Sequence, residues 1–484
     1  SLLFHAESHH FSNWLAARTE FGLASKLRPV YAHQFKSGEA LRSYLLDRLH
    51  SEKEDSKERV LDYTSSRFRR EKSDFFRLCG GSLGGKARGL GFARSMLKDS
   101  GIQKKFSNVN IRVPQCAVIG TDEFDRFMKD NDLWSIALGG IDDDGLVKHF
   151  IKARLSIDLI LRLESFIKEN KYPLAVRSSS LLEDSQYQPL AGTYETYMLP
   201  NNSRSDKKRL KELTIAIKKV FASTFKGEAR TLLNNTAHRI EEEKMAILIQ
   251  EIVGQAYKSN RFYPTFSGVL QNINYYPVSY MKRNEGVAYL ALGFGRTIVD
   301  GEKCLRISPE YPTILPQFFS IKATKENTQN QFYGLPLRAK DQLGPDLLSY
   351  NLKDAEDDGA LQWIGSVVSH EDNTIRDSLS TSGTRVVSFA PILKWKTIPF
   401  ASLAKEILSI GKKALGCPVE IEFAVNMSKD KKPEFCLLQI KPIVLTGLQK
   451  IVEDEKSVMR KIFCKSNITL GDGRINTVQD MIIV

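Results

Sequence analysis

The stretch from residue 417 to residue 444 constrains the fold most strongly, because its pattern is typical of two paired strands. Its first part, VEIEFAV, alternates apolar residues with Glu420, Glu422 and an alanine, as a half-buried strand does. Its second part, EFCLLQIKP, places Gln439 and Lys441 two residues apart, so both side chains share one face of a strand. The stretch therefore predicts an antiparallel hairpin with two carboxylates beside an amide and an ammonium group.

That set of side chains suits a metal–nucleotide complex. Carboxylate oxygens bind Mg²⁺, and a nearby cation favours phosphate. An ordinary amphipathic strand with a solvated acidic face explains the same residues, so the hairpin alone leaves its function open.

A glycine-rich segment near residue 80 supplies a second candidate phosphate site. In CGGSLGGKARGLGFARSML, residues 79–97, four glycines precede Lys86 and a helical pattern follows. Glycines let backbone amides approach a phosphate, and a helix N-terminus adds a favourable dipole. Gly80 to Lys86 spells GxxxxGK, but Ala87 stands where a P-loop needs a hydroxyl, and DFFRLC predicts only a weak preceding strand. We therefore disfavour a P-loop nucleoside triphosphatase, while a flexible glycine turn before a helix stays open.

Residues 172–199 form the third informative segment. LAVRSSS predicts a short apolar strand that ends in Arg177 and three serines, and a long polar loop leads to Gly192 and Thr193. Arginine at a strand end can bind phosphate oxygens through two N–H groups, and the glycine and threonine could lend backbone amides. A surface salt bridge is the alternative for Arg177, and its place before a serine loop disfavours it.

The N-terminal residues 1–75 predict a mainly helical arm. His5, His9 and His10 cluster there, which suggests either a metal site or surface histidines. We favour surface histidines, because no carboxylate or cysteine stands at ligand spacing.

The remaining segments predict a mixed α/β chain. NIRVPQCAVIGTDEF predicts a strand, a turn and a helix capped by Thr121, and MAILIQEIV predicts a buried strand. The acidic residues from Asp354 to Asp358 are expected to form a solvated patch.

Composition narrows the class of protein. The chain has 484 residues with 42% hydrophobic content and a net charge of +13. We expect neither a membrane span nor a secretory signal, since no run of about 18 apolar residues occurs. Six scattered cysteines without a CxxC pair indicate reduced thiols and a cytoplasmic protein. No nucleic-acid module is recognisable, so we assign the basic surplus to solvated helix faces and phosphate. The start at Ser1 and the end at MIIV suggest a piece of a longer protein.

The motifs together resemble a known family. GGSLGGKARGLGFA, VPQCAVIGTDEF, LAVRSSSLLEDSQYQPLAGTYET, ILIQEIV with FSGVL, and VEIEFAV with LLQIKP are similar, in this order, to the ATP-grasp domain of phosphoenolpyruvate synthase and pyruvate phosphate dikinase. The resemblance covers about residues 76–445 and implies an α/β ATP-grasp fold of two subdomains that clasp Mg·ATP. It implies transfer of a phosphate to a histidine on a separate domain and onward to pyruvate.

The resemblance also assigns residues to roles. It implies that phosphates are bound by Lys86, Arg177, Gln439 and Lys441, that the phosphate loop holds Gly192 and Thr193, that the adenine pocket is lined by Gln250, Glu251 and Ile252, and that Mg²⁺ is held by Glu420 and Glu422. Lys86, Arg177 and Lys441 are the expected catalytic residues. These roles suit phosphoryl transfer, because that reaction requires positioning and charge neutralisation more than covalent chemistry from the protein.

Three features depart from the family. Lys441 stands where the family usually has arginine, and Arg296 in GFGRTIVDG stands where it has an acid. The phosphohistidine and pyruvate-binding domains of the family are not recognisable, and Ser369-His370 is no substitute, so we expect both domains elsewhere in the full-length protein. A related phosphotransferase with another acceptor, such as an antibiotic or a glucan, and a degenerate nucleotide-binding sensor both stay open.

The expected organisation has four parts. They are a helical arm over 1–75, an ATP-grasp subdomain over 76–240, a second subdomain with the metal-binding hairpin over 241–445, and a tail or linker over 446–484. The family also allows a homodimer.

Overall fold

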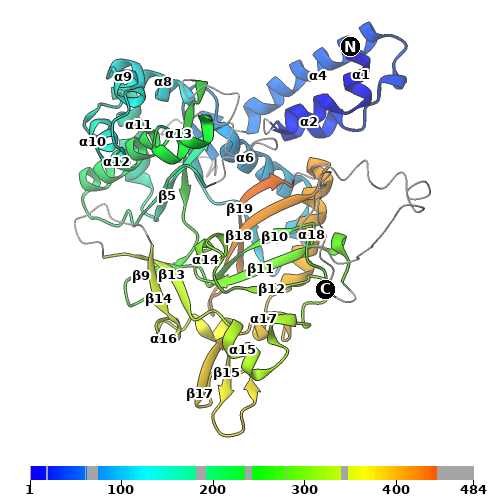
Figure 1. Cartoon of the computed structure of the whole chain (residues 1–484), viewed down its shortest axis with the longest axis vertical. Helices are drawn as coiled ribbons and strands as arrows, with labels where there is room; N and C mark the ends of the chain where they lie inside the picture. The colour runs from blue at the N-terminus through cyan, green and yellow to red at the C-terminus, as the bar shows by residue number, and fades with distance from the viewer. Residues whose placement is uncertain are drawn as a thin grey trace, which may run out of the picture.

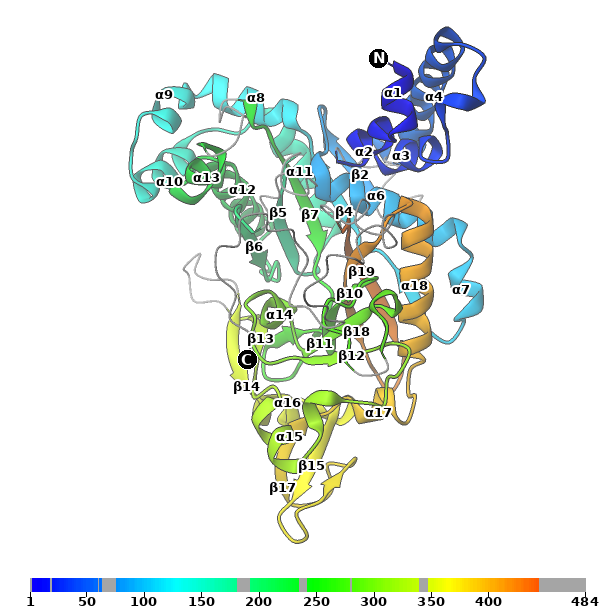
Figure 2. The same ribbon diagram turned by 45° about the vertical axis from the view of Figure 1, so that its right-hand side comes forward.

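The computed structural model describes residues 2–17, 20–59, 61–62, 75–180, 192–234, 242–278, 281–338 and 347–443. Within them the chain forms two six-stranded sheets, a four-stranded sheet and a three-stranded sheet. Figures 1 and 2 show the two larger sheets side by side, the smaller sheets beyond them, and the N-terminal helices as a separate projection.

The first sheet has the strand order β1-β2-β4-β7-β5-β6. Its strands are β1 (Leu61–Asp62), β2 (Phe75–Cys79), β4 (Cys116–Ile119), β7 (Met245–Glu251), β5 (Leu174–Ser180) and β6 (Thr196–Leu199). The first three strands in this order are parallel and the others pair antiparallel. The predicted buried strand MAILIQEIV is confirmed as β7, and DFFRLC forms β2 because it pairs on both sides.

Helices cover one side of the first sheet (Figure 1). They are α8 (Thr121–Asp130), α9 (Leu133–Leu138), α10 (Asp143–Lys152), α11 (Ile157–Glu169), α12 (Asp206–Ser223) and α13 (Gly227–Asn234). Their apolar faces and the strands form one buried core that contains Phe124, Phe221 and Ile247. The predicted Thr121 cap is wrong, because Gly120 is the N-cap residue and the Thr121 hydroxyl instead accepts a hydrogen bond from Ser82 N.

The second sheet has the order β12-β11-β10-β18-β19-β3. Its strands are β12 (Leu305–Ile307), β11 (Val287–Leu292), β10 (Phe266–Gln271), β18 (Val419–Asn426), β19 (Glu434–Pro442) and β3 (Asn110–Arg112). Only β19 and β3 pair in parallel. Strands β18 and β19 confirm the predicted hairpin, and α18 (Phe400–Leu415) packs its apolar face against β18.

Helix α6 (Gly84–Asp99) connects the two large sheets, since it packs against β5 of the first and β19 of the second. The short α7 (Ile102–Lys105) follows it. The sheets also exchange strands along the chain. Strand β7 follows residue 241 yet belongs to the first sheet, and β3 precedes residue 240 yet belongs to the second. A subdomain boundary at 240/241 would therefore separate β7 from the rest of the first sheet and β3 from the rest of the second sheet.

Two smaller sheets extend the molecule beyond the second sheet (Figure 2). One contains β14 (Leu348–Asn351), β13 (Gln331–Pro336), β9 (Arg261–Tyr263) and β8 (Gln255–Ala256), and the other contains β16 (Ile375–Arg376), β15 (Gly365–Ser369) and β17 (Gly383–Val387). The short helices of this region are α14 (Arg296–Val299), α15 (Ile321–Asn327), α16 (Leu352–Asp357) and α17 (Ala390–Leu393).

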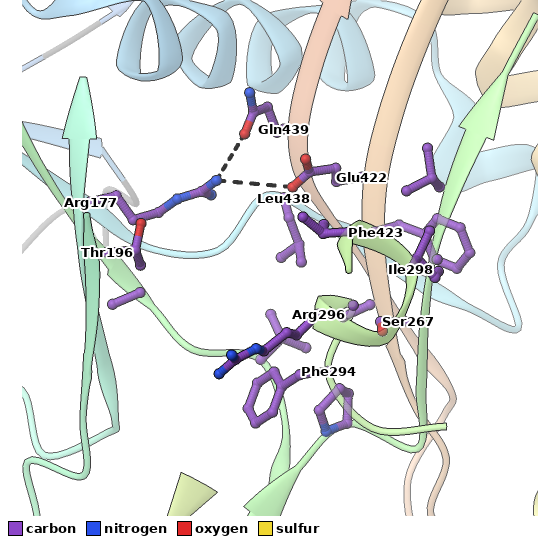
Figure 3. Close-up of a pocket in the computed structure, with 18 of the residues that line it drawn as sticks. Arg177, Thr196, Ser267, Phe294, Arg296, Ile298, Glu422, Phe423, Leu438 and Gln439 are labelled. Carbon is purple, nitrogen blue, oxygen red and sulfur yellow. Dashed lines mark hydrogen bonds and ion pairs between the residues drawn. The ribbon is translucent and has the colours of Figure 1, made fainter. Parts of the chain in front are cut away.

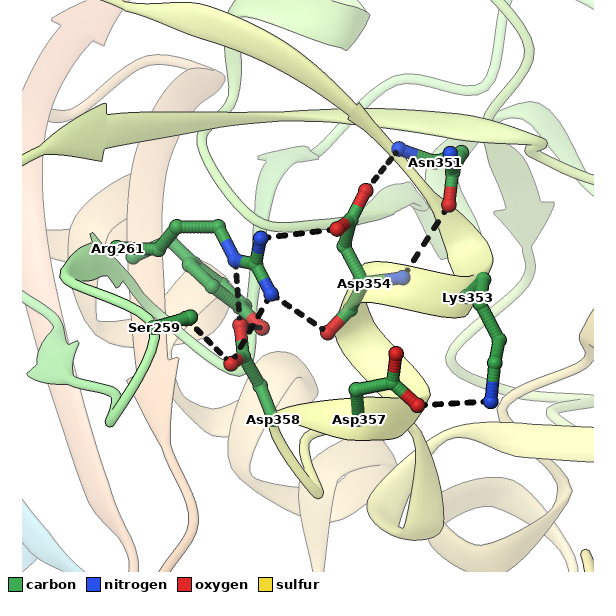
Figure 4. Close-up of polar contacts among 8 residues, drawn as sticks. Ser259, Arg261, Asn351, Lys353, Asp354, Asp357 and Asp358 are labelled. Atoms are coloured by element: carbon green, nitrogen blue, oxygen red, sulfur yellow. Dashed lines mark hydrogen bonds and ion pairs between the residues drawn. The ribbon is translucent and has the colours of Figure 1, made fainter.

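The acidic residues around α16 do not form the solvated patch expected from the sequence. Arg261 of β9 reaches them, with NH1 2.8 Å from Asp354 Oδ1 and Nε 2.8 Å from Asp358 Oδ2 (Figure 4). The Tyr263 hydroxyl donates a further hydrogen bond to Asp358, whose side chain is only 4% exposed. The prediction is wrong for these two residues, because a strand distant in sequence supplies their partner.

The N-terminal arm is helical, as predicted. It contains α1 (Leu2–Glu7), α2 (His10–Ala17), α3 (Phe21–Leu27) and α4 (Gly38–Arg59). Helix α3 attaches it to the body, where Phe21 contacts Phe92 of α6 and Arg28 donates to the Gly416 carbonyl. His5 and His10 contact each other through their Nδ1 atoms, but no three metal-binding side chains gather in the part of the chain that the structure describes.

No helix within the described ranges is long and apolar enough to cross a membrane. The loop predicted over 181–191, the end of the basic helical segment at 235–240 and the tail at 446–484 lie outside the described residues.

Candidate functional site

A cavity of about 820 Å³ lies between the two large sheets. It is lined by the predicted site residues Lys86, Arg177, Gly192, Gln250, Glu251, Ile252, Glu420, Glu422, Gln439 and Lys441. Thr193, the remaining predicted residue, is not among the lining residues. Segments that lie far apart in the sequence therefore meet at one place.

The hairpin contributes its four polar side chains in register. Glu420 lies opposite Lys441, and Glu422 lies opposite Gln439. Lys441 Nζ is 2.7 Å from Glu420 Oε1, and Gln271 Nε2 of the neighbouring β10 donates to Glu420 Oε2 at 2.7 Å. The pairing register shifts just beyond Glu422, as at a β-bulge, which reorients side chains beside many active sites.

Arg177 extends from β5 across the cavity to the second sheet (Figure 3). Its NH1 group donates to Gln250 Oε1 at 3.0 Å, and its NH2 group donates to Gln439 Oε1 at 2.8 Å. The same NH2 atom lies 3.9 Å from Glu422 Oε2. The surface salt bridge considered for Arg177 is therefore excluded, since the side chain is 15% exposed and points into the site.

The glycine-rich turn before α6 contacts the serines at the end of β5. Lys86 lies in the first turn of α6, is buried, and donates to Ser178 Oγ at 3.3 Å. Ser179 Oγ donates to the Leu83 carbonyl and accepts from Ala87 N. Gly84 has φ +73°, and an added Cβ would lie 1.5 Å from the Ser179 carbonyl oxygen. Ser178 and Ser179 thus bind the start of α6, a role that the sequence did not reveal.

Glu251 lines the cavity, but its carboxylate is already engaged. Arg112 of β3 donates to both of its oxygens, at 2.7 and 2.9 Å, and also donates from Nε to Glu434 at 2.7 Å. Arg112 thereby joins β3, β7 and β19 behind the cavity. No local pattern around Arg112 marked it, because its partners come from two distant strands.

The rest of the cavity wall is mostly apolar. It includes Ala175, Met198, Ile252, Val253, Phe294 and Leu438, which suit a planar base. Cys304 also lines the wall, and burial raises the pKa of its thiol to about 11, so it is a neutral wall residue at neutral pH. Burial likewise raises the pKa of Tyr289, another lining residue.

Arg296 begins α14 and lies at the cavity wall opposite Arg177 (Figure 3). Its Nε atom donates to Asp300 at 3.0 Å, and this hydrogen bond raises the pKa of the guanidinium above its ordinary value. Its guanidinium also lies 4.8 Å from the centre of the Tyr333 ring. Arg296 is therefore held as a positive charge at the cavity wall.

Glu420 and Glu422 fit a magnesium site of the kind completed by a substrate. Among the described residues no third carboxylate, histidine or cysteine joins them. Mg²⁺ commonly binds through one or two carboxylates together with phosphates and water. The two side chains lie on one face of β18 and line the cavity, which is the arrangement that such a complex requires.

Comparison with known proteins agrees with this geometry. Residues 81–461 match the family described as the AMP/ATP-binding domain of pyruvate phosphate dikinase. The chain is 25% identical over 354 residues to YvkC of Bacillus subtilis (strain 168), described as an uncharacterized phosphotransferase. This match covers 73% of the chain and 34% of the relative, so the chain spans about a third of that protein's length.

Proposed function

Because the chain belongs to the family of the pyruvate phosphate dikinase AMP/ATP-binding domain, we propose that its central cavity binds Mg·ATP and positions one of the phosphates for transfer. The fold is a mixed α/β fold of the ATP-grasp type with a helical N-terminal arm. ATP binding and membership of a phosphotransferase family agree with the matched relative.

One observation carries the proposal: three cations and two carboxylates converge in one cavity from four elements. Lys86 comes from α6, Arg177 from β5, Lys441 from β19, and Glu420 and Glu422 from β18. Side chains of these kinds neutralise the charge of a triphosphate and orient it. Positioning and charge neutralisation are the main contributions of a protein to phosphoryl transfer. Bound Mg²⁺ would supply additional neutralisation of phosphate charge.

The proposed contacts with the phosphates and the base come from different elements around the cavity. Lys86 would contact the phosphates from α6 and Arg177 from the first sheet, while Gln439 and Lys441 would contact them from the second sheet. Gly192 would lend its backbone amide near the phosphates, and Gln250 and Ile252 would lie beside the base with the apolar wall. Thr193 remains a proposed neighbour of the phosphate loop. For Glu251 we propose a supporting role at the base pocket, since its carboxylate binds Arg112.

We propose further that the phosphate passes to a histidine on a separate domain and then to pyruvate, as in phosphoenolpyruvate synthase. Within the described residues His370 is no rival acceptor, because it is exposed beside Thr384 and does not line the cavity. The expected phosphohistidine and pyruvate-binding domains fit a chain that spans a third of its relative.

The five described cysteines are free thiols, which supports a cytoplasmic protein. A homodimer stays a prediction, and we propose neither a nucleic-acid nor a membrane partner.

Two observations keep other functions in view. Among the described residues no histidine lines the cavity, so an antibiotic or a glucan stays an alternative acceptor. Lys441 and Arg296 differ from the family pattern, and this favours the second alternative, a sensor that binds nucleotide without turning it over.

The proposal is tested by calorimetric titration of the chain with ATP, with and without Mg²⁺. We expect metal-dependent binding that weakens at least about tenfold in Glu422→Gln, because one metal–ligand contact is lost. Glu406→Gln is the matched control, since Glu406 forms an ion pair with Lys105 outside the cavity. Absence of ATP binding under both conditions in the folded wild-type chain would contradict the proposal.

A further inference from the structure

The two carboxylates proposed for the metal are held differently. Both oxygens of Glu420 are engaged at 2.7 Å, one by Lys441 Nζ and the other by Gln271 Nε2. Glu422 instead lies 3.9 Å from Arg177 NH2, whose nearer partner is Gln439 at 2.8 Å. Glu422 is therefore the more accessible carboxylate, and Glu420 already has a cation bound.

The ion pair between Lys441 and Glu420 is built into the hairpin. The two residues are direct partners in the register of β18 and β19, so neither can move far from the other without a side-chain rotation. Their side chains are 30% and 19% exposed, which leaves water less able to screen them than at an open surface. A divalent cation that approaches Glu420 meets the ammonium group at the carboxylate oxygen it needs.

A phosphate bound in the cavity would compete with Glu420 for the Lys441 ammonium group. Lys441 lines the same cavity as Lys86 and Arg177, so an anion bound between these cations offers the Lys441 ammonium a second partner. When Lys441 turns to the phosphate, one oxygen of Glu420 becomes available to a metal ion. While Lys441 stays paired with Glu420, it occupies the carboxylate oxygen that the metal ion needs. Its ammonium group is then also not available to the phosphate.

We propose that Lys441 couples the two ligands by exchanging Glu420 for phosphate, so that each ligand favours binding of the other beyond their attraction in solution. This inference rests on the proposed function, because it assumes that the cavity binds a phosphate and a divalent cation. Coupling of this kind is reciprocal: the factor by which ATP raises metal affinity equals the factor by which metal raises ATP affinity. Lys441 acts here as a positioning residue for Glu420 as well as a phosphate contact.

The test compares coupling in four versions of the full chain: wild type, Lys441→Met, Lys441→Arg and Lys105→Met. Titration calorimetry measures MgCl₂ alone, ATP alone in EDTA, and ATP in saturating MgCl₂. The attraction between Mg²⁺ and ATP in solution is common to all versions, so it cancels from the ratio of their coupling factors. Lys105 pairs with Glu406 at 2.6 Å outside the cavity, which makes it the matched lysine.

For Lys441→Met we expect Mg²⁺ alone to bind about fivefold or more tightly than in wild type, because the competing cation is gone. We expect ATP alone to bind about tenfold more weakly, as for loss of one charged contact. The coupling factor should fall about fivefold or more, while Lys441→Arg, which keeps the charge, and Lys105→Met should stay close to wild type.

Glu420→Gln provides a second measurement in case Lys441→Met does not fold. It removes the anion that holds Lys441, so ATP alone should bind more tightly, and this gain should disappear in the double variant with Lys441→Met. Equal Mg²⁺ affinity and equal coupling in wild type and Lys441→Met, with ATP still bound, would overturn this inference and leave the proposed function intact. A folded wild-type chain that binds neither ligand would overturn both.

Discussion

Lys86, Arg177 and Lys441 place three positive charges in one cavity, and each is held by polar neighbours before any ligand arrives. Lys86 donates to Ser178, Arg177 to Gln250 and Gln439, and Lys441 pairs with Glu420. For Lys86 and Arg177, side chains fixed in this way lose little freedom when a phosphate binds, which is the advantage of a preorganised site. The contribution of each cation should therefore appear in transfer rates.

We predict that Lys86→Ala or Glu422→Ala lowers Mg·ATP-dependent phosphoryl transfer on the order of 100-fold or more, because each removes a proposed phosphate or metal contact that would stabilise the transition state. The measurement is single-turnover transfer of labelled phosphate from Mg·ATP to the proposed phosphohistidine acceptor domain. Lys105→Ala, at an ion pair outside the cavity, should keep the wild-type rate. Wild-type rates in both site variants would refute the assignment.

At the scale of elements, the start of α6 and the end of β5 depend on each other. Ser179 bonds to both sides of the Gly84 turn, and the φ of +73° at Gly84 brings the chain against the Ser179 carbonyl. The turn is thus a close contact between two backbones. Its rigidity fixes where Lys86 enters the cavity.

Gly84→Ala should therefore lower the free energy of unfolding by at least about 3 kcal/mol, since the methyl group adds a backbone clash to the strain of a positive φ. Gly101→Ala is the matched control, because Gly101 has φ +65° with no atom within 4 Å of an added Cβ. It should cost only about 1 kcal/mol. Urea denaturation of both variants measures the difference, and equal losses would contradict a contact role for Gly84.

At the scale of the whole molecule, Arg112, which does not line the cavity, links the two large sheets. Arg112 stands on β3 of the second sheet and binds Glu251, which ends β7 of the first, as well as Glu434 of β19. Helix α6 packs against both sheets from another direction. The placement of Arg177 on the first sheet relative to Glu420 and Glu422 on the second depends on these links.

Arg112→Met should destabilise the chain by about 3 kcal/mol, because it leaves the carboxylates of Glu251 and Glu434, which are 18% and 22% exposed, without their cationic partner. Hydrogen exchange should increase in β3 and β7 together, since both strands end at this link. Lys105→Met removes an ion pair whose lysine is 59% exposed, so it should cost less than about 1 kcal/mol. Unchanged exchange in both strands would show that Arg112 does not join the sheets.

The sequence by itself determined the features that follow from short-range pattern. The alternation in VEIEFAV predicted the hairpin and put Glu420, Glu422, Gln439 and Lys441 on one face, because side chains of a strand repeat every two residues. The glycine turn before α6 and the apolar strand that carries Arg177 were also visible, because each is marked by neighbouring residues, although β5 continues through Ser180 instead of ending at Arg177. The order of these motifs identified the family.

Only the tertiary structure decided which side chains meet across long separations. Arg112 with Glu251 and Glu434, Arg261 with Asp354 and Asp358, and the contact between Gly84 and Ser179 each join residues from different elements. No local period encodes such pairs, since their geometry is set by how strands are ordered in the sheets. The physical reason is that charge and backbone contacts depend on distance in space, whereas pattern depends on distance along the chain.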